Sequence, residues 1–478
     1  MIASSTLTAT AVLIFLTAAV PRLIYPFEIT WGEGSMYVQI QRIVLGKQLY
    51  VTPSTHYVAW LYEPFFYFLN SLVVRIVGLS FVHIRIVSVL ATIAIASMIF
   101  RVVYTETKKF SSGLFGIGLF VAAYGRTGSC LFVSRIDPLF VALLLFSFIL
   151  VFNSNSKFSI VFAAIVFAIS YFTKQTTLVF FPIMLIYLWV INRKNEAVVF
   201  SIVSVVSIIV GMILLESSSH GWFSFYTLDI PSAKAHFLQR DRFIHDFFIH
   251  TFLRSWPICI GISTLLLFTF VQKKRLPELN GLMLFGLFFL TALCVGFIGT
   301  LYVGGDTNIL LPASVGCAIF LPASINYLDR ENRLPKIRKW LVPGQLFLLL
   351  TLPWNFDSNV VLDNDSKNQE AFYKYVSVIP GEIWIPYHVI PESLTGKSTY
   401  SDIIAFQEAA IVDGPISRRL KAELESNLAK GHWSVIISDI KKDFIHYRLR
   451  DSIVNLNKIH MTDGPNIFIY KPESELAR

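Results

Sequence analysis

The amino-acid sequence predicts an α-helical polytopic membrane protein that ends in a small C-terminal soluble α/β domain. Hydrophobic residues make up 54% of the 478 positions and charged residues only 15%, and the mean hydropathy is +0.61. These values lie well outside the range of soluble globular proteins. Apolar runs approach the roughly 20 residues that a helix needs to cross a bilayer, and they recur up to residue 353. After that point charged residues return at ordinary frequency.

We place eleven membrane spans along the chain. Helices are expected because backbone polar groups in lipid must be satisfied within the segment. The first run has no basic residue before it, and Pro21-Arg22 replaces the small-residue cleavage site of a secretory signal, so we expect it to be retained. The predicted spans are 7–24, 81–104, 113–130, 139–152, 158–171, 178–191, 198–215, 247–271, 281–302, 309–327 and 340–353.

The distribution of lysine and arginine predicts the orientation of these spans. Basic residues gather in alternate connections, at 108–109, 157, 193–194, 273–275 and 330–339. Cytoplasmic loops carry such an excess, so the other connections and the C-terminus are expected outside. The predicted outer loops are 25–80, 126–138, 172–177, 216–246 and 303–308.

The first outer loop, residues 25–80, is too long for a simple connector and is rich in aromatic residues. Its apolar stretch 63–77 is about half a span long, which is typical of a helix lying in the membrane interface. The alternative is one more span, but this would invert every later loop and place the basic clusters outside.

The predicted domains are a transmembrane domain, residues 1–353, and an extracytoplasmic domain, residues 354–478. From residue 355 onward the chain has 14 basic and 17 acidic residues, against 26 and 14 before it. The net charge of +9 therefore belongs to the membrane part, and it does not indicate a nucleic-acid partner. In the tail we predict strands at 382–386, 433–438 and 467–470 and an amphipathic helix at 417–430.

Cysteine usage indicates neither a disulfide framework nor a zinc site. The chain has four cysteines, all in or beside predicted spans, and the tail has none. A secreted scaffold held by disulfides shows a denser pattern, and a structural zinc site shows close pairs of ligands.

The candidate catalytic base is Glu33, which follows the first apolar run and is flanked by Gly32 and Gly34. Glycines permit a substrate to approach the backbone closely, and a carboxylate just above the apolar layer is able to accept a hydroxyl proton. The structural alternative is a helix N-cap or a solvated loop acid. Two other acids of this loop, Glu28 and Glu63, are alternatives for the base, although Glu63 precedes a proline and is typical of a helix start.

Three cations, Arg126, Arg135 and Lys174, lie near outward-facing membrane ends, where the positive-inside tendency disfavours them. A charge at such a boundary indicates function, unless it pairs locally or reaches the interface. Arg135 has Asp137 nearby as a structural partner, whereas Lys174 has no acid in its own loop, which favours a role in binding phosphate.

Three further polar residues of the outer loops are secondary candidates for substrate contact. His236 lies in the charged loop 216–246, where simple solvation is the alternative. Asp306 and Asn308 precede the apolar run 309–327, so they are placed either to bind sugar or acceptor hydroxyls or to cap the helix that follows.

A base and several cations facing a membrane-embedded cavity suit transfer from a lipid phosphate. Phosphate is a good leaving group, so its departure needs positive charge on the oxygens more than a general acid. The acceptor hydroxyl needs the base. A polyprenyl tail on the donor would explain why the scaffold is a membrane protein.

Several short segments of this chain occur in an order that resembles the bacterial GT-C glycosyltransferases. These enzymes are relatives of protein mannosyltransferases and of the lipid A aminoarabinose transferase, and they use polyprenyl-phosphate sugars. The resemblance covers about residues 20–330. The segments are Gly32-Glu33-Gly34 with Tyr37, 45–50, 62–67, 85–88, 134–138, 172–177 and 304–308.

The resemblance implies a GT-C fold and inverting transfer of one sugar on the outer side of the bacterial cytoplasmic (inner) membrane. Glu33 stands where the family places its catalytic acid. Many relatives have an Asp-Glu pair where this chain has Gly32-Glu33, so we infer no cofactor but leave dependence on a divalent metal open. We assign the donor phosphate to Lys174 with Arg126 or Arg135, and the secondary candidates for substrate contact are Asp137, Glu63, Tyr62, Asp306, Asn308 and His236.

The sequence leaves the sugar and the acceptor open, since a lipopolysaccharide, a cell-wall glycan, another lipid and a protein are all compatible. The expected partners are a polyprenyl-phosphate sugar donor, an envelope acceptor and the membrane. A polytopic lipid or glycan transporter or flippase is the alternative function, although no internal repeat of the kind seen in transporters is found. An inactive member acting as an assembly scaffold is a third possibility.

Overall fold

The structure is a computed structural model that describes residues 2–124, 127, 130–154, 156–235, 280–301, 307–330, 363–438, 447–453 and 467–472. The chain divides into two compact units. The first, here called the helical unit, comprises Met1–Val20, Ser88–Met212 and Phe237–Val360. The second, here called the mixed unit, comprises Pro21–Val87, Ile213–His236 and Val361–Arg478.

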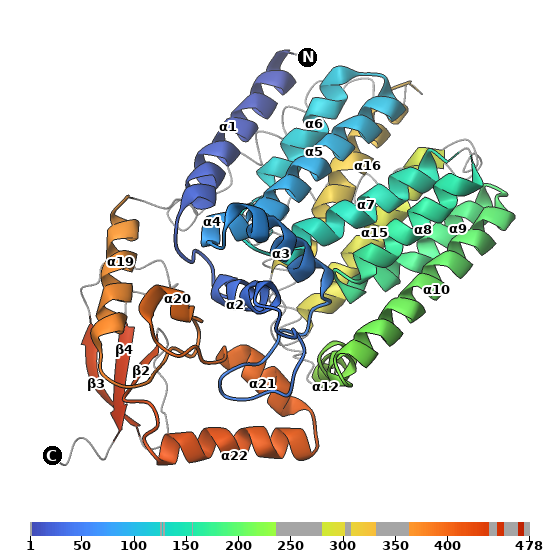
Figure 1. Cartoon of the computed structure of the whole chain (residues 1–478). Helices are drawn as coiled ribbons and strands as arrows, with labels where there is room; N and C mark the ends of the chain where they lie inside the picture. Colours follow the sequence, from blue (N-terminus) through green and yellow to red (C-terminus); the bar gives the residue numbers. More distant parts are fainter. Residues whose placement is uncertain are drawn as a thin grey trace. The chain divides into compact units, whose positions relative to one another are not determined.

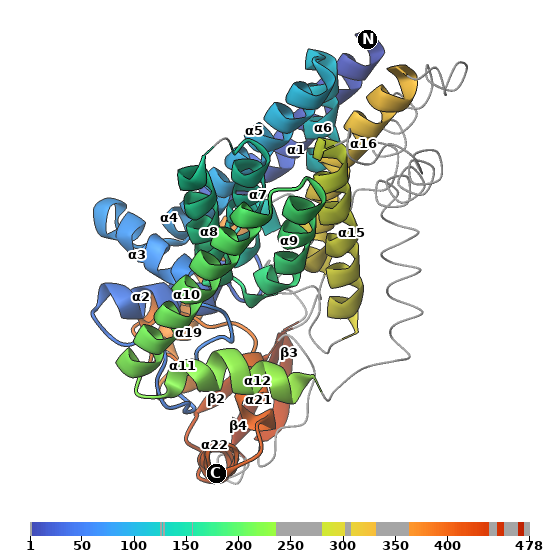
Figure 2. The same ribbon diagram turned by 90° about the vertical axis from the view of Figure 1, so that its right-hand side faces the viewer.

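The helical unit is a bundle of apolar helices (Figures 1 and 2). Within it α6 packs on α16, α16 packs on α15, and α7 packs on α8. α1 and α10 each continue into the mixed unit. The elements are α1 (Ile2–Ile24), α5 (Ile86–Thr107), α6 (Phe110–Ala122), η2 (Cys130–Phe132), α7 (Ile136–Phe152), α8 (Lys157–Tyr171), η3 (Gln175–Phe180), α9 (Phe181–Val190), α10 (Lys194–Ser218), α15 (Asn280–Thr300), η7 (Thr307–Leu310) and α16 (Leu311–Arg330).

Small and hydroxyl-bearing residues explain how these apolar helices pack closely. A Cβ at Gly116 of α6 would lie 2.8 Å from the carbonyl oxygen of Ala318 in α16, so glycine lets the two backbones approach. The buried Ser147 hydroxyl of α7 donates to the carbonyl of Ala163 in α8 at 2.8 Å. Hydrogen bonds between helices satisfy polar groups that lipid would leave without a partner.

Four described helical segments are long and apolar enough to cross a membrane: Phe81–Thr107, Lys194–Ser218, Gly281–Thr300 and Thr307–Tyr327. Six shorter apolar helices accompany them among the described residues. Every predicted span except two falls on one of these helices. The predicted span 113–130 is shorter in the structure, because α6 ends at Ala122 and Cys130 begins a separate 3-10 turn. The predicted spans 247–271 and 340–353 lie outside the described residues.

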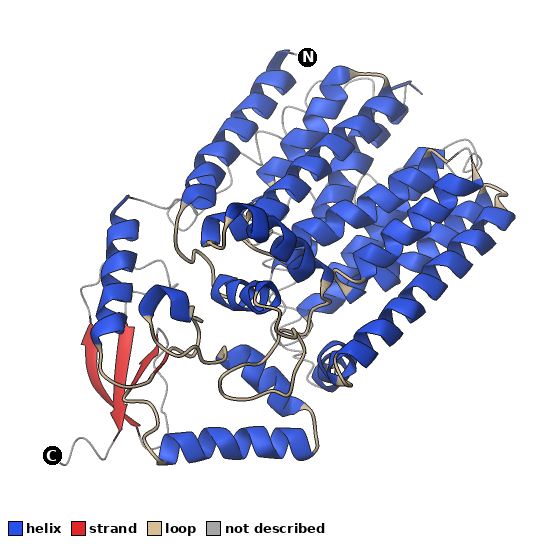
Figure 3. Ribbon diagram, viewed as in Figure 1, coloured by secondary structure: helices blue, strands red, loops and turns tan. Residues whose placement is uncertain are grey.

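The mixed unit contains the described strands, which form one four-stranded sheet in the order β1-β2-β4-β3 (red in Figure 3). β1 (Ile383–Trp384) pairs parallel with β2 (Val435–Ser438), whereas β4 (Ile467–Pro472) runs antiparallel to both β2 and β3 (Tyr447–Ile453). The three predicted strands coincide with β1, β2 and β4. β3 was not predicted, because it carries alternating charges in place of an apolar run.

The helices of the mixed unit come from three separate stretches of the chain. α19 packs its apolar residues Phe372 and Val376 against the sheet residues Val435, Ile437 and Ile469. The predicted tail helix 417–430 corresponds to α22. The elements are α2 (Glu33–Val44), α3 (Phe65–Val77), α4 (Phe81–Ile84), α11 (Trp222–Ser224), the π-helix η4 (Phe225–Asp229), α12 (Ile230–Lys234), α19 (Asp363–Val378), α20 (Glu392–Thr395), α21 (Ile403–Ile411) and α22 (Pro415–Ala429).

The C-terminal tail and the first predicted outer loop share the mixed unit, an association that the sequence did not indicate. The hydroxyl of Thr55 donates to Glu423 of α22 at 2.6 Å, and the backbone N–H of Ser401 donates to the carbonyl of Thr55 at 2.9 Å. A side-chain ion pair joins Lys234 of α12 to Glu408 of α21. The predicted domain boundary at residue 353 lies outside the described residues.

Candidate active site

Glu33 is the first residue of α2 and forms a buried ion pair with Arg85. Gly32 precedes it with φ of +90°, a left-handed conformation that favours glycine. The Glu33 Oε1 accepts from Arg85 Nε at 2.8 Å, and its Oε2 accepts from Arg85 Nη2 at 2.8 Å and from the backbone N–H of Ile29 at 2.9 Å. Both side chains are fully buried. The interpretation of Glu33 as a solvated loop acid is therefore wrong, and the N-cap position belongs to Gly32.

All five N–H donors of Arg85 are used inside the mixed unit. Two go to Glu33, and the other three go to the carbonyls of Arg22, Tyr25 and Phe27. One guanidinium thus fixes the chain that leads from α1 to the start of α2. Arginine suits this role because its donors form a rigid planar fork that stays charged.

The carboxylate of Glu28, one of the two alternative acids, also holds the start of α2. Its Oε1 accepts from the backbone N–H of Gly34 at 3.0 Å, and its Oε2 lies 3.2 Å from Nδ1 of His388 in the tail. Both side chains of this pair are buried, with exposed fractions of 1% for Glu28 and 3% for His388. Glu28 therefore supports the backbone on the C-terminal side of Glu33.

Glu63 is a buried carboxyl in the same unit. Its side chain is fully buried, and neither oxygen has a hydrogen-bond partner among the described residues. Burial raises the pKa of Glu63 to about 8, because a low-dielectric surrounding disfavours the charged form. α3 begins at Phe65, as the Glu63-Pro64 sequence indicated. The neighbouring Tyr62 accepts a hydrogen bond from the hydroxyl of Tyr50 at its carbonyl oxygen, at 2.6 Å.

A second polar cluster, in the helical unit, joins Asp137, Lys174 and Asn308. Lys174 Nζ lies 2.7 Å from Asp137 Oδ1, and the Asn308 amide donates to Asp137 Oδ2 at 2.9 Å. The salt bridge of Asp137 is thus made with Lys174, 37 residues along the chain. Lys174 and Asn308 are hydrogen-bonded to Asp137, and Arg135 adds an electrostatic contribution. The backbone N–H of Arg135 donates to Ser88 Oγ at 3.3 Å, and Arg135 precedes the first residue of α7.

The remaining predicted site residues, Arg126, Asp306 and His236, lie outside the described residues. Among the residues that are described, no group of three or more His, Cys, Asp and Glu side chains is arranged as a metal site. The sequence singled out Glu33, Asp137, Lys174 and Asn308, but it missed Arg85 as the partner of Glu33 and His388 as the partner of Glu28. A basic residue in the first turns of an apolar run was the available signal for Arg85.

Comparison with known proteins places the chain in a family. The model of glycosyltransferase family 87 matches residues 60–321, which is more than half of the chain. No curated protein sequence matches the chain. The crystal structure of ArnT from Cupriavidus metallidurans bound to undecaprenyl phosphate is similar in fold, with a TM-score of 0.63, 9% sequence identity and coverage of 97% of both chains. ArnT from the same organism in the apo state gives a TM-score of 0.58 at 11% identity, covering 91% of this chain and 92% of that one.

At these identities the likeness establishes the fold alone. It confirms the predicted α-helical polytopic GT-C architecture with a small C-terminal mixed sheet. The family match supplies the activity class, which the fold cannot supply by itself. The chain is thus a multi-pass membrane glycosyltransferase and belongs to glycosyltransferase family 87.

Proposed function

We propose that this enzyme moves one sugar, with inversion, from a polyprenyl-phosphate donor to an acceptor hydroxyl on the outer side of the bacterial cytoplasmic membrane. The observation that carries the proposal is the similarity in fold, over 97% of the chain, to an ArnT structure that holds undecaprenyl phosphate. Membership of a glycosyltransferase family favours sugar transfer over the alternative of a lipid or glycan flippase. The acceptor is an envelope glycan, lipid or protein.

In the proposed reaction the acceptor hydroxyl oxygen attacks the anomeric carbon of the sugar from the side opposite the phosphate. The new glycosidic C–O bond forms while the bond between the anomeric carbon and the phosphate oxygen breaks. The hydroxyl proton passes to a carboxylate of the enzyme, and the lipid phosphate leaves with the bonding electrons. The enzyme therefore needs a base on one side and positive charge on the other.

Glu33 is our first assignment for the base. Its pairing with Arg85 keeps a charged carboxylate next to a permanent cation, and the fixed backbone around it favours a defined geometry. The same pairing sets a requirement, since both oxygens already accept hydrogen bonds. An acceptor hydroxyl must therefore displace or share one of the bonds from Arg85 or Ile29.

Glu63 is the second assignment, favoured by its carboxyl oxygens, which have no hydrogen-bond partner among the described residues. A carboxyl whose pKa is about 8 is mostly protonated at pH 7, so as a base it would work better as the pH rises. The pH dependence of transfer thus separates the two assignments. If Glu63 is the base, the rate of sugar transfer increases as the pH rises past 8. If Glu33 is the base, no such increase is required.

For the leaving phosphate we propose Lys174, with Arg126 or Arg135 as the second cation. Lys174 is 13% exposed and is held by Asp137 at 2.7 Å, so its ammonium group is oriented before a donor arrives. Asn308 holds the other oxygen of Asp137. In this arrangement Asp137 and Asn308 position Lys174, and the phosphate oxygens share its protons with Asp137.

The test supplies purified enzyme in detergent with a radiolabelled polyprenyl-phosphate sugar and an envelope extract, and it measures release of the lipid phosphate and labelling of the acceptor. Glu33→Gln is expected to abolish transfer, while the matched control Glu425→Gln, an exposed acid on α22, retains it. Full activity of Glu33→Gln together with loss in Glu63→Gln would move the base to Glu63. If intact donor moves across the membrane of vesicles that contain the protein and no sugar is released, the proposed sugar transfer is refuted and the flippase alternative is favoured.

A further inference from the structure

The C-terminal tail contacts the two residues that follow the proposed base, Gly34 and Ser35. Glu33 itself is held by Arg85, which directly follows α4. The next two residues, Gly34 and Ser35, are held by groups of the tail. This division raises the question of what the tail contributes to the reaction.

The contact at Gly34 is backbone against backbone. A Cβ built on Gly34 would lie 2.1 Å from the carbonyl oxygen of Val389, so no side chain fits there. The tail residue next to Val389 is His388, whose Nδ1 lies 3.2 Å from Glu28 Oε2. The other oxygen of Glu28 accepts from the Gly34 N–H at 3.0 Å. Glu28 therefore transmits the position of the His388 ring to the peptide that follows Glu33.

The contact at Ser35 adds a second tether from the tail. Ser35 Oγ donates to Asp402 Oδ2 at 3.2 Å. The other oxygen of Asp402 caps the start of α21 by accepting from the N–H of Ile404 at 2.6 Å. Burial raises the pKa of Asp402 to about 7.

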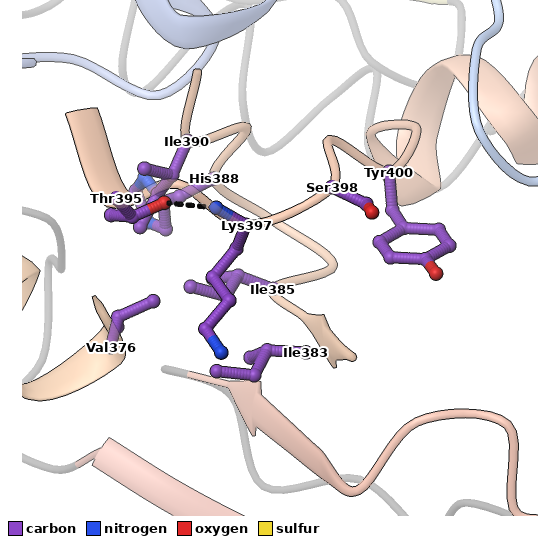
Figure 4. A pocket seen from close by; sticks show the side chains of 9 residues that line it. All are labelled: Val376, Ile383, Ile385, His388, Ile390, Thr395, Lys397, Ser398 and Tyr400. Carbon is purple, nitrogen blue, oxygen red and sulfur yellow. Dashed lines mark hydrogen bonds between the residues drawn. The ribbon is translucent and has the colours of Figure 1, made fainter. Parts of the chain in front are cut away.

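The surroundings of His388 leave no room for a substrate at its ring. The ring is 3% exposed. The hollow beside it, shown in Figure 4, has a volume of about 20 Å³ and is lined by apolar side chains and by His388, Thr395, Lys397, Ser398 and Tyr400. That volume holds about one water molecule. His388 is thus unable to meet a sugar or a lipid phosphate directly.

We infer that His388 is a positioning residue for sugar transfer, acting through Glu28 on the peptide that carries Glu33. This inference rests on the proposed function, since it assigns the role of the tail in that reaction. The tail in this view sets the geometry of the base and does not bind the donor. A misplacement of about 1 Å in a catalytic group costs about 100-fold in rate, so loss of one tether is enough to be measured.

The test compares His388→Asn with His388→Gln and His388→Phe, using release of lipid phosphate as the assay. The Asn amide reaches the position of the histidine Nδ1, whereas the Gln amide reaches the position of Nε2. We expect Asn to retain most of kcat, and Gln and Phe to lower kcat by about 10- to 100-fold while KM for the donor stays unchanged.

The matched control is Glu423→Gln, which weakens another contact between tail and first loop, at Thr55. It should leave kcat near the wild-type value, since the described hydrogen bonds of Thr55 go to Glu423, Asn427 and Ser401 and not to residues 33 to 35. Adding Glu28→Gln to His388→Phe should lower kcat little further, because both act through one contact. If Phe fails to fold, the Asn and Gln pair carries the test.

The outcomes separate the inference from the proposed function. If the wild-type enzyme releases no lipid phosphate, the proposed function is refuted. If it is active and His388→Gln keeps the same kcat as His388→Asn, or changes KM alone, the positioning role is refuted. A fall in kcat for Gln that Asn rescues supports it.

Discussion

The buried carboxyl of Glu63 predicts a loss of stability on raising the pH, and Glu63→Gln should abolish this effect. In the folded protein the pKa of Glu63 is about 8, against an ordinary value of 4.5. Between these values the folded state binds the proton and the unfolded state does not, so stability falls as the pH rises. This loss of stability, caused by ionisation of Glu63, is small below pH 4.5 and reaches its full size above pH 8.

The size of the effect follows from the two pKa values. The whole shift corresponds to about 5 kcal/mol, of which about 2.5 kcal/mol falls between pH 6 and pH 8.5. Glu63→Gln has no proton to lose, so its free energy of unfolding lacks this term. The variant should gain about 2.5 kcal/mol on wild type across that pH range, or about 5 to 10 °C in melting temperature for a domain of 150–250 residues.

The assay is thermal unfolding of both proteins in detergent, followed by tryptophan fluorescence from pH 6 to pH 8.5. Other titrating groups, including Asp402, are common to both proteins and drop out of the difference. A difference in melting temperature that stays constant with pH would refute the buried, unpaired state of Glu63. A difference that shrinks as the pH rises would show the opposite sign, and it would mean that Glu63 is paired with a cation.

The other predictions concern the groups that hold the two clusters. Arg85→Gln leaves a buried carboxylate unpaired, so we expect about 3–5 kcal/mol of destabilisation, read from the melting temperature in detergent; a variant as stable as wild type would contradict the burial of the pair. Gly34→Ala should lower the yield of folded protein sharply, because its Cβ would lie 2.1 Å from the carbonyl oxygen of Val389. The control Gly46→Ala has open space around it but a φ of +71°, and it should cost only about 1 kcal/mol of stability. Equal melting temperatures for the two variants would count against the close contact. Lys174→Ala should weaken donor binding about 10-fold or more, and it should also lower the melting temperature because it leaves the buried Asp137 without its cation. Unchanged donor affinity in a titration of the folded variant would remove Lys174 from the phosphate site.

The sequence predicted the described apolar helices, the tail helix α22 and three of the four described strands because their signals are local. Long apolar runs in the membrane part and short apolar runs in the tail each mark an element without reference to distant residues. The site was predicted only in part for the same reason. Glu33, Lys174 and Asn308 stood out through neighbours in their own segments.

The partners of these residues were not predictable, since they come from far along the chain. Arg85 is 52 residues from Glu33, and His388 is 360 residues from Glu28. Lys174 has no acid in its own loop, and its partner Asp137 lies on α7, 37 residues earlier in the chain. A single sequence contains hydrophobic periodicity but no direct record of which charges meet. The grouping of the tail and the first loop into one unit was not predicted for the same reason, since it depends on contacts between distant parts of the chain.

The bare backbone crossing at Gly34 and Val389 limits how this enzyme can be re-engineered by recombination. In a chimaera whose C-terminal segment comes from another family member, the backbone that contacts position 34 is that of the other protein. The borrowed segment would dock only if its backbone can cross Gly34 at the same close distance, however similar the two proteins are overall. Grafting experiments should therefore exchange the first loop and the C-terminal segment together, as a matched cassette.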